Sequence, residues 1–160
     1  MSTTTIDLQE WLDTLTEIAK HYAANHLRFD RNAAPPSPAA PGEPRPAVYV
    51  SILGARSSMH LGIATTPDGA CALARAFLSM RGPEELAEHD VVDGFSEILN
   101  ILAGKVKSRM TARDSSLKLG LPMYVCGSVG HGDGTEKLTA DVMMGPVPCQ
   151  IQVFRQSRTA

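Results

Sequence analysis

Glu97 and Asn100 are the two side chains whose types and spacing best favour chemistry in this sequence. They lie in residues 90–110, the most regular helical pattern of apolar residues in the chain. Residues three apart point to the same side of a helix, so the carboxylate and the amide would face one partner together. Polar residues are also common on any solvated helix face, so the spacing alone is a weak signal.

The surroundings of the pair strengthen the signal. At about 100° per residue the predicted helix has one apolar stripe, made of Val91, Phe95, Ile98, Leu99, Leu102 and Val106. The opposite side is predicted to carry Asp93, Glu97, Asn100 and Gly104, with Lys107 at its edge. Gly94 and Gly104 each cost roughly 1 kcal/mol of helix stability relative to alanine, so local stability does not explain them. Ile101 lies beside Glu97, outside the apolar stripe, so this side is predicted to be a docking surface with clearance for a partner.

Charge and composition exclude several function classes. The chain has 160 residues and a formal net charge of −2, without the basic excess of a nucleic-acid-binding protein. No apolar run approaches the ~20 residues of a membrane helix, and the first residues lack the basic and apolar regions of a secretory signal. The widely spaced Cys71, Cys126 and Cys149 fit no zinc motif and are expected to be buried in a reducing cytoplasm. We therefore expect a cytoplasmic protein without nucleic acid, membrane or metal ligands of its own.

The other segments alternate strands and helices, and their order predicts the fold class. Before the central element we expect a helix over 6–27, a hairpin of strands over 47–53 and 59–64, and a helix from Thr66 to Gly82. The central element, 83–109, is expected to be one helix or two. After it we expect extended segments over 117–127, 137–144 and 149–154, with a glycine-rich loop over 127–136. The prediction is an α+β fold, a mainly antiparallel sheet of about five to six strands packed against two to three helices.

A proline-rich segment divides the chain. Six of the fourteen residues in 33–46 are proline, which disfavours both helix and sheet. We predict an N-terminal helix in residues 1–28, a linker in 29–46 and the main domain in 47–156. Because such a linker can extend to about 40 Å, the first helix is free to pack on its own domain or on another subunit.

The central segment resembles a known family. Residues 84–127 are similar to the CheX branch of the CheC/CheX/FliY family of chemotaxis phosphatases. The similarity is carried by the acidic lead-in PEELAEHDVVDGFSEI, the core EILNILAG followed by KSR, and the downstream LKLGLPMYVCG. It extends over roughly 47–155, weakens in the N-terminal helix and is absent from the linker. The Glu-x-x-Asn motif occurs once, at Glu97 and Asn100.

The resemblance implies hydrolysis of the aspartyl phosphate of a CheY-like receiver domain. An acyl phosphate is already reactive, so the catalyst mainly has to position water in line with phosphorus. The amide of Asn100 can hold that water by one donated and one accepted hydrogen bond. The carboxylate of Glu97 is better suited to pair with a lysine of the receiver and fix the docked geometry. No cofactor of this chain is expected, because the Mg²⁺ of such a complex belongs to the receiver.

Two further expectations follow from the resemblance. CheX members with one motif act as homodimers joined at sheet edges, so a homodimer is expected here. The alternative function is a non-catalytic adaptor of the same fold that binds a signalling partner through the same helix face. A small-molecule sensor with a pocket between sheet and helices is a third, weaker hypothesis, because no sequence feature selects a ligand.

Overall fold

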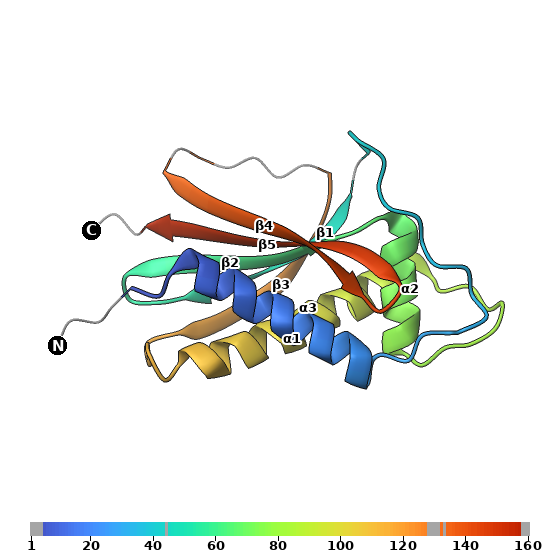
Figure 1. Ribbon diagram of the computed structural model, residues 1–160, viewed down its shortest axis with the longest axis horizontal. Coiled ribbons are helices and arrows are strands. Elements are labelled where there is room, and N and C mark those ends of the chain that lie inside the picture. Colours follow the sequence, from blue (N-terminus) through green and yellow to red (C-terminus); the bar gives the residue numbers. More distant parts are fainter. Residues whose placement is uncertain (1–4, 44, 128–131, 133, 158–160) are drawn as a thin grey trace.

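An antiparallel sheet of five strands carries three helices, which confirms the α+β prediction (Figure 1). The structure is a computed structural model that describes residues 5–43, 45–127, 132 and 134–157. The helices are α1 (Leu8–His26), α2 (Pro67–Phe77) and α3 (Glu88–Met110). The strands are β1 (Pro46–Leu53), β2 (Ser57–Ala64), β3 (Lys118–Cys126), β4 (Thr135–Met144) and β5 (Val147–Ser157). None of the helices in the described part of the chain combines the length and the hydropathy of a membrane span.

The order of strands in the sheet is β3-β1-β2-β5-β4, and each neighbouring pair is antiparallel. Alternate residues of β1, β2 and β5 point to the helices and form the core with them. Val48, Val50 and Ile52 represent this row in β1, and all three are fully buried. α3 packs over β3 and β1, whereas α1 packs over β4 and β5 (Figure 1). The two helices therefore lie next to each other on the same face of the sheet.

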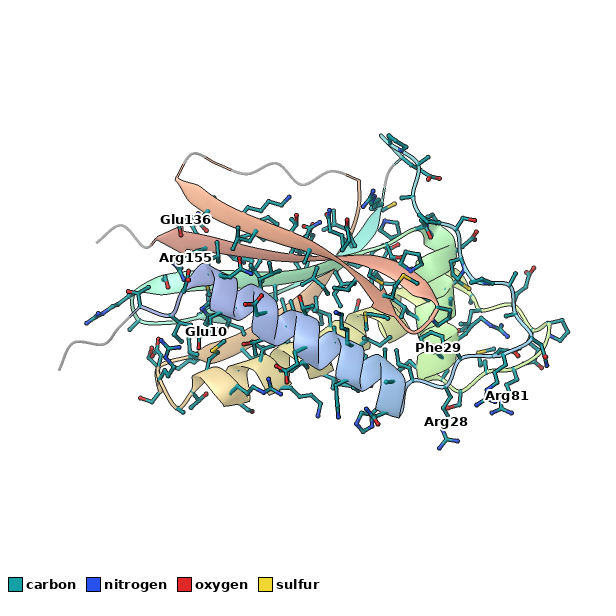
Figure 2. All side chains as sticks on the ribbon, in the orientation of Figure 1. Glu10, Arg28, Phe29, Arg81, Glu136 and Arg155 are labelled. Atoms are coloured by element: carbon teal, nitrogen blue, oxygen red, sulfur yellow. The ribbon has the colours of Figure 1, made fainter. Side chains whose placement is uncertain are left out.

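α1 is held at both of its ends by the main domain of the same chain. The side chain of Asp7 caps the helix by accepting a hydrogen bond from the backbone N–H of Gln9. Just before this cap, Arg155 of β5 donates a hydrogen bond to the backbone oxygen of Ile6 (Figure 2). After the helix, the ring of Phe29 packs on Gly145 in the turn between β4 and β5, where any side chain would collide with it (Figure 2).

The linker leaves α1 along α2, away from α3. The backbone N–H of Arg28 bonds to the oxygen of Ala76, and the carboxylate of Asp30 accepts from the N–H of Gly82 at 3.3 Å. The backbone N–H of Asn32, which contributes most, and that of Gly82 donate hydrogen bonds to the Asp30 carboxylate and hold its pKa below its usual range. Pro38 and Ala39 continue toward Thr65 and β4. The described residues of the linker therefore do not cover the side of α3 that carries Glu97.

Three local predictions were wrong. α2 ends at Phe77, because Ser79 adopts a left-handed conformation (φ 55°) and lets the N–H of Met80 bond back to the oxygen of Arg75. This is a Schellman-type end, which usually has glycine at the position that Ser79 takes here. α3 begins at Glu88 rather than residue 83 and runs without a break. Cys126 is exposed and Cys71 half-buried, so only Cys149 matches the predicted burial.

Residues 128–131 and 133 of the predicted glycine-rich loop lie outside the described residues.

Candidate functional site

The candidate site is the side of α3 that faces away from the sheet. Its opposite side is anchored by apolar side chains that are fully buried, namely Phe95, Ile98, Leu99, Leu102 and Val106. Because both sides belong to one continuous helix of 23 residues, the buried stripe fixes the direction in which Glu97 and Asn100 point. Val91, which was assigned to the same stripe, is only partly buried near the helix start.

The predicted site residues are accessible to different degrees. Asp93 and Glu97 are exposed, whereas Asn100, Ile101, Gly104 and Lys107 are half-buried. Part of Ile101 packs against the hydrophobic core, so only its remaining surface is available to a partner. The six residues therefore share one side of α3, with the two acids most exposed and the amide set slightly deeper.

Glu97 and Asn100 have no competing partner within the described residues. Neither side chain takes part in a hydrogen bond or ion pair there. Water satisfies such groups in the free protein, and exchanging that water for a partner's polar groups costs little. The carboxylate and the amide are thus available for a second molecule.

The two glycines of α3 have different surroundings. A Cβ at Gly94 would come within 3.0 Å of the Cβ and 3.2 Å of the Cα of Ala74 in α2. A Cβ at Gly104 would meet no atom within 4 Å outside its own helix. Gly94 is therefore a packing position, and the predicted clearance for a partner applies to Gly104 alone.

α1 lies beside α3 and borders the site. Arg109 of α3 pairs with Glu17 of α1 at 3.1 Å, and Arg113, just beyond α3, pairs with Glu10. The pairing order shows that the two helices run in opposite directions. Both ion pairs are well exposed, so each contributes little to the free energy of unfolding. They do show how α1 and α3 are aligned along each other.

Tyr22, near the end of α1, lies close enough to Glu97 to be affected by its charge. Burial raises the pKa of the Tyr22 phenol, and the negative charge of Glu97 raises it further. No sequence feature places Tyr22 at the site, because its apolar spacing explains it as a core residue of α1. Only the packing of α1 against α3 brings the two side chains together.

Sequence comparison assigns the chain to a family. The family model described as "Chemotaxis phosphatase CheX" matches residues 47–138, which is more than half of the chain and includes Glu97 and Asn100. The chain belongs to the CheX family. This match agrees with the resemblance in the central segment and leaves out α1 and the linker. No curated protein matches the chain.

Solved structures of the CheX and CheC type share the fold. The CheX protein of Vibrio vulnificus has a TM-score of 0.71 at 16% identity, over 95% of this chain and all of that one. A CheC-like superfamily protein from Shewanella sp. PV-4 has a TM-score of 0.66 at 17% identity, over 96% of this chain and all of that one. The CheX–CheY–BeF₃–Mg²⁺ complex of Borrelia burgdorferi has a TM-score of 0.67 at 15% identity, over 96% of this chain and all of the matched one. Because these alignments cover nearly the whole chain, α1 and the sheet follow the fold of CheX proteins.

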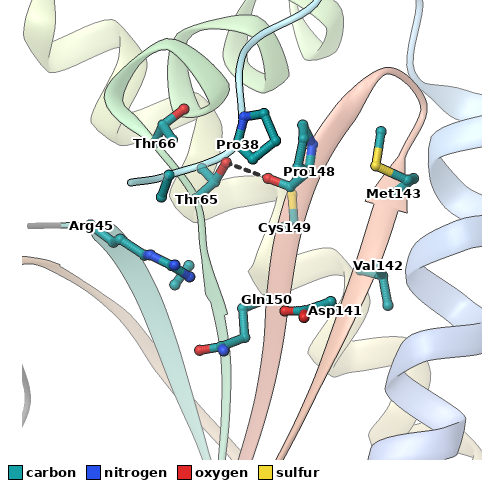
Figure 3. A pocket seen from close by; sticks show the side chains of 12 residues that line it. Pro38, Arg45, Thr65, Thr66, Asp141, Val142, Met143, Pro148, Cys149 and Gln150 are labelled. Atoms are coloured by element: carbon teal, nitrogen blue, oxygen red, sulfur yellow. Dashed lines mark hydrogen bonds between the residues drawn. The ribbon is translucent and has the colours of Figure 1, made fainter. Parts of the chain in front are cut away.

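A pocket between the linker, the start of α2 and the β4–β5 strands lies apart from this site (Figure 3). It has a volume of about 410 Å³ and is lined by linker residues, by Thr65 and Thr66 before α2, and by residues of β4 and β5. Arg45 and Asp141 give it one charge of each sign, and no residue of α3 lines it. Among the described residues, no three His, Cys, Asp or Glu side chains gather in a group that could hold a metal ion. Neither observation selects a ligand, so α3 remains the candidate functional site of this CheX-family chain.

Proposed function

We propose that this chain hydrolyses the aspartyl phosphate of a CheY-like receiver domain, with Asn100 and Glu97 as the residues that act on it. The observation that carries the proposal is the accessible, unpartnered pair on one side of α3, in a chain that belongs to a family of chemotaxis phosphatases. The complex of a Borrelia burgdorferi CheX with CheY supports a receiver as the partner.

Asn100 orients the attacking water. Its amide accepts one hydrogen bond from the water and donates another, which directs an oxygen lone pair toward phosphorus. Water attacks phosphorus and the bond to the aspartate oxygen breaks. The products are inorganic phosphate, which keeps the proton released by water, and the free aspartate carboxylate.

Glu97 docks the receiver. A carboxylate next to an anionic phosphoryl group would repel it, so Glu97 is better suited to a cation beside the phosphate than to the water. We assign it to a lysine of the receiver's active site, where a charge-assisted hydrogen bond fixes the docked geometry. The Mg²⁺ that neutralises phosphate charge is held by the receiver and not by this chain.

Asp93, Ile101, Gly104 and Lys107 complete the docking surface. Gly104 has open space above it, so the receiver's backbone can approach α3 closely there. The uncovered part of Ile101 offers an apolar contact, while Asp93 and Lys107 place opposite charges toward the two ends of the surface. Charges of this kind affect orientation and association rate more than affinity.

The test is phosphate release from receiver domains that have been phosphorylated with acetyl phosphate. The wild-type chain should accelerate release from at least one receiver of the panel. Asn100→Ala should lower the catalysed rate by about 10² or more while binding to the beryllofluoride-activated receiver survives, as for loss of a preorganised transition-state contact. Glu97→Ala should lower the catalysed rate and, unlike Asn100→Ala, should also weaken binding of the activated receiver.

Ser108→Ala is a matched control, since Ser108 is exposed on α3 and its hydroxyl bonds only to the oxygen of Gly104 in its own helix. This control variant should keep wild-type activity. Unchanged catalysis in both Asn100→Ala and Glu97→Ala would refute the assignment. Binding without any acceleration by the wild-type chain would instead establish the adaptor function.

We further propose that the chain forms a homodimer through the edge strand β3. The two edges of the sheet differ, because β3 exposes the apolar side chains of Leu121 at 88% and Met123 at 59%. β4 exposes the acids Glu136 and Asp141 beside one apolar side chain, Met143 at 52%. An apolar, unpaired edge favours pairing with another strand, and a charged edge disfavours it. Leu121→Lys should give a monomer by light scattering, and Thr139→Lys on β4 should leave the dimer intact.

The three free cysteines fit a reducing compartment, and we place the reaction in the cytoplasm.

A further inference from the structure

α1 packs against α3, and a row of polar residues on α1 borders this contact. The spacing of three and four residues puts Glu10, Thr14, Glu17, His21 and Asn25 in one row. Glu10 and Glu17 of this row are the residues that pair with Arg113 and Arg109. The row is therefore fixed against the second half of α3, and its continuation points toward the first half, where the candidate site lies.

The last two residues of the row, His21 and Asn25, are exposed. The amide nitrogen of Asn25 donates to the backbone oxygen of His21 at 2.8 Å, so the side-chain oxygen of Asn25 is not used in that bond. The His21 ring lies 6.4 Å from the ring of His26, centre to centre, and forms no ion pair within the described residues. Both side chains thus keep hydrogen-bonding capacity for a second molecule.

Tyr22 connects this part of α1 with the site. Its ring is buried beneath the helix end and lies 5.2 Å from the ring of His26. The charge of Glu97 adds to the burial that raises the pKa of the Tyr22 phenol, which agrees with the helix geometry in placing the end of α1 beside Glu97. A protein that sits on Glu97 and Asn100 would therefore also meet the last turns of α1.

We propose that the last two turns of α1 are a second wall of the receiver-docking surface, on which His21 and Asn25 contact the receiver beside its phosphoaspartate and help to select it. This inference rests on the proposed function. The wall is continuous with the α3 surface and is held in register by two ion pairs. The wall is polar and lies on α1 rather than beside Asn100 on α3, so it should affect binding of the receiver rather than the chemical step.

The chain offers a control on the same helix. Asp13 and Lys20 are exposed residues of α1 outside this row, and Asp13 accepts a hydrogen bond from the side-chain amide of Gln9 in the same helix at 2.8 Å. Asp13→Ala/Lys20→Ala removes two polar side chains without changing the net charge, and His21→Ala/Asn25→Ala removes two polar side chains from the row. Comparing the two double variants separates a contact with the receiver from a general effect on α1.

The experiment measures steady-state hydrolysis with the phosphorylated receiver that the wild-type chain accelerates most. His21→Ala/Asn25→Ala should raise KM about tenfold and leave kcat within about twofold, because a binding contact has been lost and the chemistry has not. Binding of the beryllofluoride-activated receiver should weaken by the same factor. Asp13→Ala/Lys20→Ala should match the wild type, and circular dichroism should show that both variants are folded.

Failure of this inference can be told from failure of the proposed function. An unchanged KM in His21→Ala/Asn25→Ala, while Asn100→Ala is inactive, overturns the wall and leaves the phosphatase assignment intact. A fall in kcat at unchanged KM, or an equal effect of the control variant, also overturns it. If the wild-type chain neither binds nor dephosphorylates any receiver, both the proposed function and the proposed role of α1 in docking are refuted.

Discussion

Gly94 and Gly104 lie on the same helix, and one has a tightly packed environment while the other has an open one. Gly94 is where α2 approaches α3, close enough that a Cβ would touch Ala74. Gly104 is on the Glu97 side of the helix and has space above it. The sequence shows two equivalent departures from good helix formers. The structure shows that one is required for packing within the chain and the other is available for contact with a partner.

The same contrast applies to the two sides of α3. The packed side contributes to stability, since its apolar residues form the core with the sheet and α2. The open side contributes contacts that exist only in a complex. The two sides should therefore respond differently to mutation, and the free energy of unfolding, measured by urea denaturation, is the quantity that separates them.

The largest expected effect is at Phe95, which is fully buried on the packed side. Phe95→Ala should lower the free energy of unfolding by about 3–5 kcal/mol, through lost apolar burial and the cavity left behind. Ile101→Ala, on a half-buried residue of the same helix, is the control and should cost clearly less. Similar losses at the two positions would contradict the division into a packed and an open side.

The next effect concerns the contact between α2 and α3. Gly94→Val should lower the free energy of unfolding by about 1–3 kcal/mol, because the added methyl groups have no room beside Ala74. Gly104→Val makes the same change in open space and should alter stability by no more than about 0.5 kcal/mol. Equal destabilisation by the two variants would show that Gly94 is not a close-packing position.

Gly104→Ala should have a smaller effect of opposite sign. Alanine restricts the unfolded chain and favours helix, so the free energy of unfolding should rise by up to about 1 kcal/mol. The same methyl group should raise KM for the phosphorylated receiver, since it occupies the space left for docking. A stabilised variant with wild-type KM would remove Gly104 from the docking surface.

The smallest effects on stability are expected for the two motif residues. Glu97→Ala and Asn100→Ala should each change the free energy of unfolding by less than about 0.5 kcal/mol, because neither side chain has a partner in the described chain. Thermal melts compared with the dephosphorylation assay would check this. A large loss of stability in either variant would mean that the residue has a structural role.

The fold class could be predicted from the sequence because its elements are strongly periodic. α1, α3 and the β1–β2 hairpin form where the apolar spacing placed them, and the Thr66–Pro67 start of α2 is confirmed by the Thr66 side chain, which accepts from the N–H of Gly69 at 2.9 Å. The end of α2 was wrong, since a serine takes the left-handed position at which glycine is the usual signal. The exposure of Cys126 could not be predicted, because it lies near the end of an edge strand and the sequence does not reveal which strands are edges.

The sequence by itself determined that Glu97 and Asn100 share one side of a long helix, because helix periodicity is a local property. It also identified the family through the same residues. Only the tertiary structure decided that Gly94 is a packing position, that the linker lies along α2, and that α1 brings Tyr22 to the border of the site. These features depend on which helix faces meet, and contacts between residues far apart in the chain are set by the packing of the whole core rather than by local pattern.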